Sequence, residues 1–389
     1  MCQKAAVIPE LPSETLDQLP SPSLLIEKGQ MLANVERMRL ALAHHHVDLR
    51  PHVKTCKSAP IARLMAEGWS GAVTVSTLRE AEESFAAGFR DILYAVGITP
   101  QKLPEVERLT RAGADLSLIL DSVEAAEMVA AYCRNRDLRL PILIEIDSDG
   151  HRAGVAPDDE ETLISIGTVL HQKGAELRGV MTHGGGSYDV AGEAALARHA
   201  ELERSGAVGA AASLRRAGLP CPVVSVGSTP TALHAKDLTG VTEVRAGVYV
   251  FFDLVMVGVG ACGVGEVALS VLTRVIGHQR ARGWIIVDAG WMALSRDRGT
   301  QRQAVDQGYG LVCDIEGKPI EDLVVISANQ EHGIIAHRGG LLLDVERFPI
   351  GMPLRILPNH ACATAAQHDN YHLVEAGAVE KLLPRFRGW

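Results

Sequence analysis

Apolar and polar positions follow two alternating periodicities between residues 30 and 250. Short runs rich in valine, isoleucine and leucine recur, and each is followed by a segment with an apolar residue every three or four positions. Because the short runs are apolar throughout, they indicate parallel strands that are buried on both faces of a sheet. The expected strands are 49–53, 71–76, 91–96, 115–121, 141–147, 177–183, 223–228 and 242–250.

Eight strand–helix units within residues 25–255 predict an α/β fold, a (β/α)8 barrel. An open, doubly wound sheet is the alternative. It is the weaker one, because no GxGxxG motif follows the first strand. A chain of 389 residues is also too long for one core, so we expect a second domain.

The pattern changes after the predicted barrel. Helical periodicity fades, and strand-like runs appear between glycine and aspartate turns, so residues 256–389 are expected to form a β-strand domain. The segment PSLLIE at 22–27 reads as a further strand. Residues 1–24 are therefore expected to pack on the second domain.

Composition and charge exclude several classes of protein. A net charge of −9 and a pI near 5.9 argue against a nucleic-acid or anionic-membrane partner. No apolar run reaches the roughly 20 residues that span a bilayer, and the first 20 residues lack the apolar core of a signal peptide. The seven cysteines are scattered without a CxxC pair, which is typical of reduced thiols in the cytoplasm.

The stretch RPHVKTCKS at 50–58 places a lysine at the end of the first predicted strand. In a barrel the reacting groups lie at the C-terminal strand ends. If Lys54 is buried there, desolvation lowers its pKa and makes the amine a nucleophile that can form an imine with a carbonyl cofactor. The alternative is an exposed loop lysine with no catalytic role.

Other strand ends carry groups that suit a phosphorylated cofactor. The seventh strand ends in GSTPT at 227–231 and the eighth in RAGVYVF, two loops where barrels frequently bind phosphate. The fifth and sixth strands end in IDSDGHRAGV and THGGGSYD. Together with the lysine, these loops predict a barrel that binds pyridoxal 5'-phosphate (PLP). The candidate residues are Lys54, Arg152, His183, Tyr188, Gly227, Ser228, Thr229, Gly247 and Val248.

The motif PNHACAT at 358–364 is a candidate metal site in the second domain. On an extended segment, His360 and Cys362 would point the same way and could share one cation. The alternative is a packed histidine beside an inert cysteine. Glu331 or His332 could complete or orient the site. The run SRDRGT at 295–300 is either a solvated turn or a source of cations that face an anionic substrate.

Taken together, RPHVKTCKS, HRAGV, VSVGSTPT and PNHACAT resemble the alanine-racemase-like, fold-type III PLP enzymes, in the branch of D-serine dehydratase and D-threonine aldolase. The resemblance covers essentially the whole chain. It implies that Lys54 holds PLP, that Arg152 contacts the phenolic oxygen of the cofactor, and that Tyr188 lies near its ring. It also implies phosphate binding by the loops at 227–229 and 247–248, a divalent metal on the 360/362 pair, and a homodimer. Many relatives have histidine at position 56, where this chain has cysteine, so the role of Cys56 stays open.

The activity that the resemblance implies is dehydration of a D-3-hydroxy amino acid, above all D-threo-3-hydroxyaspartate, to a 2-oxo acid and ammonia. Aldolase cleavage to glycine and an aldehyde, and D-serine dehydration, are alternatives. Aldolases of this branch typically read HxD, so the HxC motif favours dehydration. Zinc, manganese and cobalt all suit the site.

Two further questions stay open from the sequence. A non-catalytic PLP carrier and a metal-dependent barrel hydrolase without PLP are alternatives from other classes. A carboxylate on the substrate side chain would need a cationic partner, and the candidates are Arg296, Arg298 and Lys57.

Overall fold

The computed structural model describes residues 14–389, and Cys2 lies outside this range. Two compact units are present. The barrel unit comprises Val35–Tyr249, Val259–Ala261 and Phe386–Trp389. The β unit comprises the described residues up to Asn34, together with Val250–Gly258 and Cys262–Arg385. Helix α1 (Lys28–Leu42) contributes residues to both units.

The barrel unit contains a closed ring of eight parallel strands, in the order β3-β10-β9-β8-β7-β6-β5-β4. A parallel bridge between His52 and Thr74 joins the two ends of this order. The ring confirms the predicted barrel and excludes the open sheet. Its strands are β3 (Asp48–Pro51), β4 (Val73–Val75), β5 (Asp91–Gly97), β6 (Asp115–Leu120), β7 (Pro141–Ile146), β8 (Glu176–Thr182), β9 (Val223–Val226) and β10 (Glu243–Ala246).

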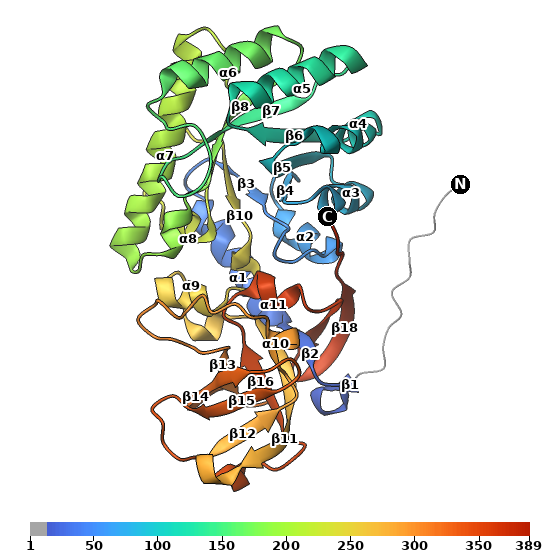
Figure 1. Ribbon diagram of the computed structural model, residues 1–389, viewed down its shortest axis with the longest axis vertical. Helices are drawn as coiled ribbons and strands as arrows, with labels where there is room; N and C mark the ends of the chain where they lie inside the picture. Colours follow the sequence, from blue (N-terminus) through green and yellow to red (C-terminus); the bar gives the residue numbers. More distant parts are fainter. Residues whose placement is uncertain (1–13) are drawn as a thin grey trace, which may run out of the picture. The chain divides into compact units, whose positions relative to one another are not determined.

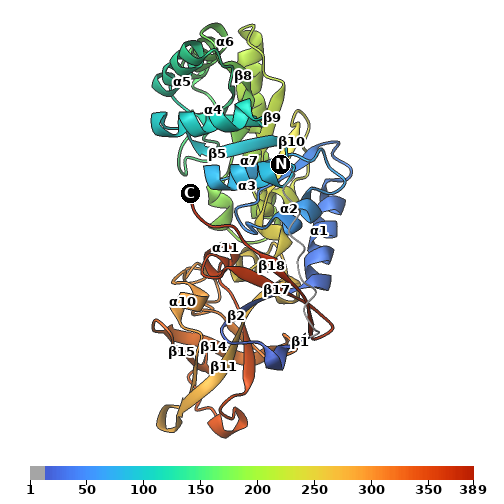
Figure 2. The ribbon, with the colours of Figure 1, turned by 90° about the vertical axis from the view of Figure 1, so that its right-hand side faces the viewer.

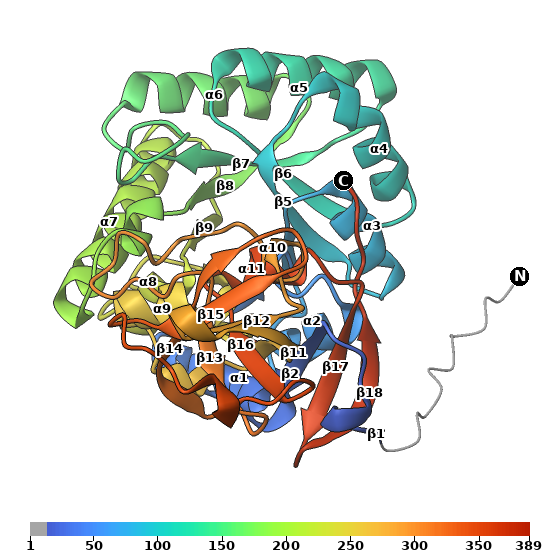
Figure 3. The same ribbon diagram turned by 60° about the horizontal axis from the view of Figure 1, so that its bottom comes forward.

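Helices cover the outside of this ring (Figure 1, Figure 3). Sequence signals explain where they begin: the Thr77 side chain accepts a hydrogen bond from the Glu80 amide, and Ser122 caps the helix after β6. The helices are α2 (Ala59–Ala66), α3 (Leu78–Ala86), α4 (Leu103–Arg111), α5 (Val123–Arg136), α6 (Glu160–Gln172), α7 (Glu193–Arg216) and α8 (Thr229–His234), with short 3-10 turns η2 (Pro100–Lys102), η3 (Gly185–Tyr188) and η4 (Val248–Val250).

Ion pairs and apolar side chains both fill the barrel. One apolar cluster joins four neighbouring strands through Leu93, Ile119, Leu143 and Met181. The buried Arg50 guanidinium contacts both carboxylate oxygens of Glu243 at 2.9 Å and Asp91 Oδ1 at 2.7 Å. The Ser225 hydroxyl donates to Glu243 as well, at 2.7 Å. A buried charge is tolerated only when paired in this way.

The β unit is built on one mainly antiparallel sheet, in the order β1-β18-β17-β2-β11-β12-β15-β14-β13-β16. Strands β11 and β16 also pair, so the six strands from β11 to β16, all labelled in Figure 1, form a closed ring. Strands β2, β17 and β18 of the same sheet are labelled in Figure 2. The strands are β1 (Glu14–Thr15), β2 (Ser23–Glu27), β11 (Leu269–Gln279), β12 (Trp284–Val287), β13 (Leu311–Cys313), β14 (Pro319–Ala328), β15 (Gly333–His337), β16 (Pro353–Leu357), β17 (Asn370–Glu375) and β18 (Ala378–Pro384).

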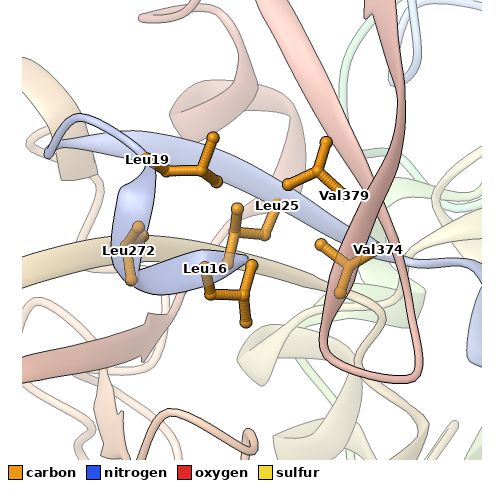
Figure 4. Close-up of a cluster of buried hydrophobic side chains, with 6 residues drawn as sticks. All are labelled: Leu16, Leu19, Leu25, Leu272, Val374 and Val379. Carbon is orange, nitrogen blue, oxygen red and sulfur yellow. The ribbon is translucent and has the colours of Figure 1, made fainter. Parts of the chain in front are cut away.

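The N-terminal strand β2 lies inside this sheet, antiparallel to β11 and parallel to β17. The expected pairing of PSLLIE is therefore confirmed. An apolar cluster holds the strand in place (Figure 4): Leu16, Leu19, Leu25, Leu272, Val374 and Val379. The short helices of the region are η1 (Leu16–Gln18), α9 (Leu254–Val259), η5 (Val264–Glu266), η6 (Arg280–Arg282), α10 (Trp291–Leu294), η7 (Val345–Arg347) and α11 (Ala361–Ala365).

Two further predictions concern the cysteines and membrane-spanning segments. No disulfide links the cysteines of the described part of the chain, which are Cys56, Cys133, Cys221, Cys262, Cys313 and Cys362. Within residues 14–389 no helix has the length and apolar character needed to cross a bilayer.

Candidate active site

Lys54 lies in the turn that follows strand β3, at the C-terminal end of the barrel strands. The sequence left burial and exposure of this side chain open, and the structure shows it exposed. The reason is that β3 ends at Pro51, which leaves the lysine beyond the sheet in a turn closed by the Lys57 amide donating to the Val53 carbonyl at 2.7 Å. The Lys54 amide in turn faces His52 Nδ1 at 3.4 Å.

Two histidines accompany Lys54. Desolvation, together with the charges of Lys54 and Arg245, lowers the pKa of His52 well below its usual value and that of His183 to about 3. Both imidazoles are therefore neutral at pH 7. His183 Nδ1 lies 3.2 Å from the Gly227 carbonyl oxygen, an acceptor, so Nδ1 carries the proton and Nε2 is left as an acceptor.

The loops after β9 and β10 pack closely together. Gly227 has φ +121°, and a Cβ there would lie 2.7 Å from the Arg245 carbonyl oxygen. A Cβ on Gly247 would lie 2.6 Å from the His52 carbonyl oxygen. Only glycine allows this approach of the strand ends. As a result, the two predicted phosphate loops and the loop of Lys54 converge at one end of the barrel.

Hydroxyl groups fix the phosphate loops further. Ser228 is the N-cap of α8, and its side chain accepts a hydrogen bond from the Thr231 amide at 3.3 Å. The Thr229 hydroxyl accepts from the Tyr249 amide at 3.2 Å, which ties the β9 loop to the β10 loop. Ser228 and Thr229 are buried, and Val248 follows on the β10 loop with 8% of its surface exposed.

Arg152 and Tyr188 occupy the loops after β7 and β8. Arg152 is exposed, and its Nη2 lies 3.6 Å from Oε1 of the buried Glu145. The Tyr188 ring is half-buried, with its centroid 6.1 Å from that of His183. The two side chains therefore come from the loops where the sequence placed them.

Two buried charged groups of this region were not predicted from the sequence. The Arg245 guanidinium, on β10, donates to the Ser225 hydroxyl at 2.9 Å and to the Thr182 carbonyl. Glu203, on α7, accepts a hydrogen bond from the Gly184 amide at 2.6 Å. Burial raises the pKa of Glu203 to about 7, against the lowering effect of Thr231 and the Gly184 amide. A charged residue inside a predicted buried strand was the signal for Arg245, whereas a glutamate in a long polar helix gave none for Glu203.

The second candidate centre lies in the β unit. His360 Nδ1 and Asp297 Oδ2 are 2.7 Å apart, and the Cys362 thiol also interacts with this imidazole. The expected extended segment is wrong, because His360 is the extended N-cap of α11 and Cys362 lies in its first turn. The strand-to-helix junction still brings the two side chains together.

Neighbouring groups hold this imidazole in place. Burial lowers the pKa of His360, but Asp297 and Cys362 outweigh that effect and raise it to about 11. Asp253 is buried close to the ring and accepts hydrogen bonds from the Ala361 and Met256 amides, at 2.9 and 3.0 Å. A proton would have to leave the site when a cation binds.

Glu331 and His332 lie in the turn between β14 and β15, and both are exposed. Over residues 14–389 there is no group of three histidine, cysteine or acidic side chains arranged to hold a metal ion. Neither residue therefore completes a three-ligand site.

Both centres fit the groups that the sequence analysis implied. A His/Cys donor pair suits a borderline cation such as Zn²⁺ and leaves positions for water or substrate oxygens. Asp297 on Nδ1 orients the ring so that Nε2 is available as a ligand. In the barrel, a lysine amine, neutral imidazoles and convergent glycine-rich loops suit an aldehyde cofactor with a phosphate group.

Family models match both parts of the chain. Residues 26–255 match the alanine racemase N-terminal domain, and residues 268–374 match the serine dehydratase domain.

Curated relatives match along nearly the whole chain. The D-threo-3-hydroxyaspartate dehydratase of Delftia sp. (strain HT23) is 54% identical over 97% of this chain and 100% of its own. The D-threonine aldolase of Arthrobacter sp. is 28% identical over 96% of this chain and 94% of its own.

Solved structures agree with these matches. The structure of the Delftia enzyme superposes with a TM-score of 0.95 over 97% of this chain and 100% of that one, and a cysteine-to-alanine variant of it has been solved in a metal-free form. An alanine racemase of Clostridium difficile, 13% identical with a TM-score of 0.68 over 94% of this chain and 98% of its own, shows the fold alone.

Proposed function

The chain belongs to the family of the alanine racemase N-terminal domain and also matches the serine dehydratase domain, and we propose that it is a PLP- and metal-dependent dehydratase of D-3-hydroxy amino acids. The preferred substrate is D-threo-3-hydroxyaspartate, which loses water and then ammonia to give oxaloacetate. The observation that carries the proposal is the 54% identity, over 97% of this chain and 100% of the relative, to an enzyme of that name.

The barrel supplies the amine and the cofactor loops. Lys54 would hold PLP and move the α-proton of the substrate, because it carries the amine at the strand ends where the phosphate loops converge. Gly227, Ser228, Thr229, Gly247 and Val248 would bind the phosphate, and Arg152, His183 and Tyr188 would line the ring. When bound, PLP supplies an electron sink for the charge left at the α-carbon.

The β unit supplies the metal ligands. His360 and Cys362 would bind one divalent ion, zinc or manganese, with Asp297 fixing the imidazole. Such an ion acts as a Lewis acid on the β-hydroxyl, which is otherwise a poor leaving group. Removal of the α-proton and the hydroxyl yields an enamine, and its hydrolysis gives the 2-oxo acid and ammonia.

Product analysis tests the proposal. Purified protein loaded with PLP and Mn²⁺ or Zn²⁺ is incubated with D-threo-3-hydroxyaspartate, D-serine and D-threonine. Oxaloacetate and ammonia in equal amounts, with the first substrate preferred, are the expected result. Glycine and glyoxylate from 3-hydroxyaspartate would replace this function with the aldolase, and the absence of any product would overturn it.

The proposal extends to a homodimer, which the resemblance to fold-type III enzymes implies. Light scattering should then give twice the chain mass of 41.6 kDa. A monomer with full activity would refute this part alone.

A further inference from the structure

Of the three cations considered for a substrate carboxylate, Lys57 is already paired. Its Nζ lies 3.0 Å from Oε1 of Glu80, a carboxylate whose side chain is 1% exposed. Withdrawing the lysine would leave that buried charge without its partner, which is costly. Lys57 therefore has a structural role and is not available to bind a substrate carboxylate.

Arg298 is also engaged by neighbouring side chains. Its Nη2 lies 2.8 Å from Asp306 Oδ2, and its guanidinium lies over the Tyr309 ring, 5.0 Å from the centroid. Its charge and one of its faces are thus in use, whereas its Nε is buried and has no hydrogen-bond partner among the described residues. A substrate carboxylate would have to compete with the Asp306 carboxylate for the same cation.

Arg296 differs from both. It makes no ion pair or hydrogen bond with any side chain or backbone group of residues 14–389. Its guanidinium carbon lies 5.2 Å from the centroid of the Trp291 ring. Stacking engages the face of a guanidinium and leaves its N–H edge free for a carboxylate. The side chain is therefore steered by Trp291, and its donors are available.

The backbone next to Arg296 is tied to the metal centre. Asp297 contacts His360 through its carboxylate, and its carbonyl accepts a hydrogen bond from Asn359 Nδ2 at 3.1 Å. On the other side, Ser295 is buried and its hydroxyl accepts from the Asp297 amide at 3.2 Å. Arg296 is thus adjacent in sequence to Asp297, which orients the proposed metal ligand His360.

The chemistry of 3-hydroxyaspartate requires a cation close to the metal ligands. Its β-carbon carries both the hydroxyl that leaves and a carboxylate, so a cation for the carboxylate must lie beside the ion that binds the hydroxyl. We propose that Arg296 binds the β-carboxylate and thereby selects D-3-hydroxy amino acids that carry a second acid group. This inference rests on the proposed function and names its substrate class.

Replacing Arg296 by glutamine and by lysine tests the assignment, with kcat/KM measured on D-threo-3-hydroxyaspartate and on D-serine. Loss of a charge-assisted contact should lower the first value by about 100-fold in Arg296→Gln, with D-serine changed less than about threefold. Arg296→Lys should recover part of the lost kcat/KM, because lysine keeps the positive charge but cannot donate two parallel hydrogen bonds to a carboxylate. Arg282→Gln is the matched control, since Arg282 is an exposed arginine stacked on a tryptophan, Trp284, at 4.6 Å. It should change neither value.

The possible results distinguish the role of Arg296 from the proposed dehydratase activity. An equal fall on both substrates, or an unchanged preference in Arg296→Gln, would overturn the role of Arg296 while the wild-type dehydratase activity stands. If the wild-type protein releases a 2-oxo acid from neither substrate, the proposed function fails and the role of Arg296 fails with it.

Discussion

The Asp297 carboxylate lies 2.7 Å from Nδ1 of His360, and this contact fixes which ring nitrogen can face a metal. Asp297 is half-buried, and its other oxygen accepts a hydrogen bond from the Gly299 amide at 2.7 Å, so the carboxylate itself is held in one orientation. Partners of this kind set both the tautomer and the basicity of a ligating histidine.

Asp297→Asn should weaken metal binding by about 10- to 100-fold, since an amide orients the ring less well and adds no negative charge. Competition against a chromophoric chelator measures the metal Kd directly. Asp306→Asn is the control, because Asp306 pairs with Arg298 in the same loop region. Equal metal affinity in Asp297→Asn and wild-type protein would contradict the positioning role.

Lys54→Ala should abolish the absorbance band of lysine-bound cofactor and lower kcat by about 100- to 10,000-fold, the usual size of an acid–base contribution. The spectrum and the rate are measured on the same PLP-loaded sample. Lys173→Ala, which removes only an exposed lysine paired with Glu127, should leave both unchanged. A retained band in Lys54→Ala would exclude this residue as the attachment point.

The pH dependence of stability should depend on Glu203, whose pKa burial raises to about 7. Between about pH 4.5 and 7 the folded protein keeps a proton that the unfolded chain has lost, so this group lowers the free energy of unfolding as pH rises through that window. The effect is at most roughly 3 kcal/mol. Glu203→Gln should therefore stabilise the protein more at pH 8 than at pH 5 in urea unfolding.

A second glutamate on the same helix serves as the control, because replacing it changes the helix in the same way without changing a buried carboxyl. Glu201 is exposed and pairs with Arg204, so Glu201→Gln should change stability by less than about 1 kcal/mol at either pH. If Glu203→Gln shows the same small, pH-independent change, the buried carboxyl does not titrate as described.

Arg50→Met should destabilise the barrel by about 3–5 kcal/mol, because it removes the ion-pair partner of the buried Glu243 carboxylate and leaves the Ser225 hydroxyl and the charge of Arg245. Arg178→Met, which breaks a pair with the exposed Asp115, should cost about 1 kcal/mol or less. Urea unfolding of the two variants checks the difference. Similar losses in both would show that burial of the Arg50 pair is not what matters.

Strand and helix order were predictable from the sequence because buried parallel strands are apolar throughout and few other patterns produce that signal. The ends of elements were less predictable: β3 stops before Lys54, and α11 begins at the residue after His360. The side chains of His360 and Cys362 lie close together, as predicted, but through a helix N-terminus and not through an extended segment. Asp297 could not be identified as its partner, since 63 residues separate it from His360 and one loop aspartate resembles any other.

Strand β2 lies between β11 and β17, two partners from the last third of the chain. Synthesis releases the N-terminus first, so β2 emerges before either neighbour exists. The barrel strands, which pair mostly with their successors in sequence, can assemble while the ribosome is still translating. The β unit has to wait for its last strands, and a nascent chain arrested near residue 365 would present a folded barrel beside an open strand edge.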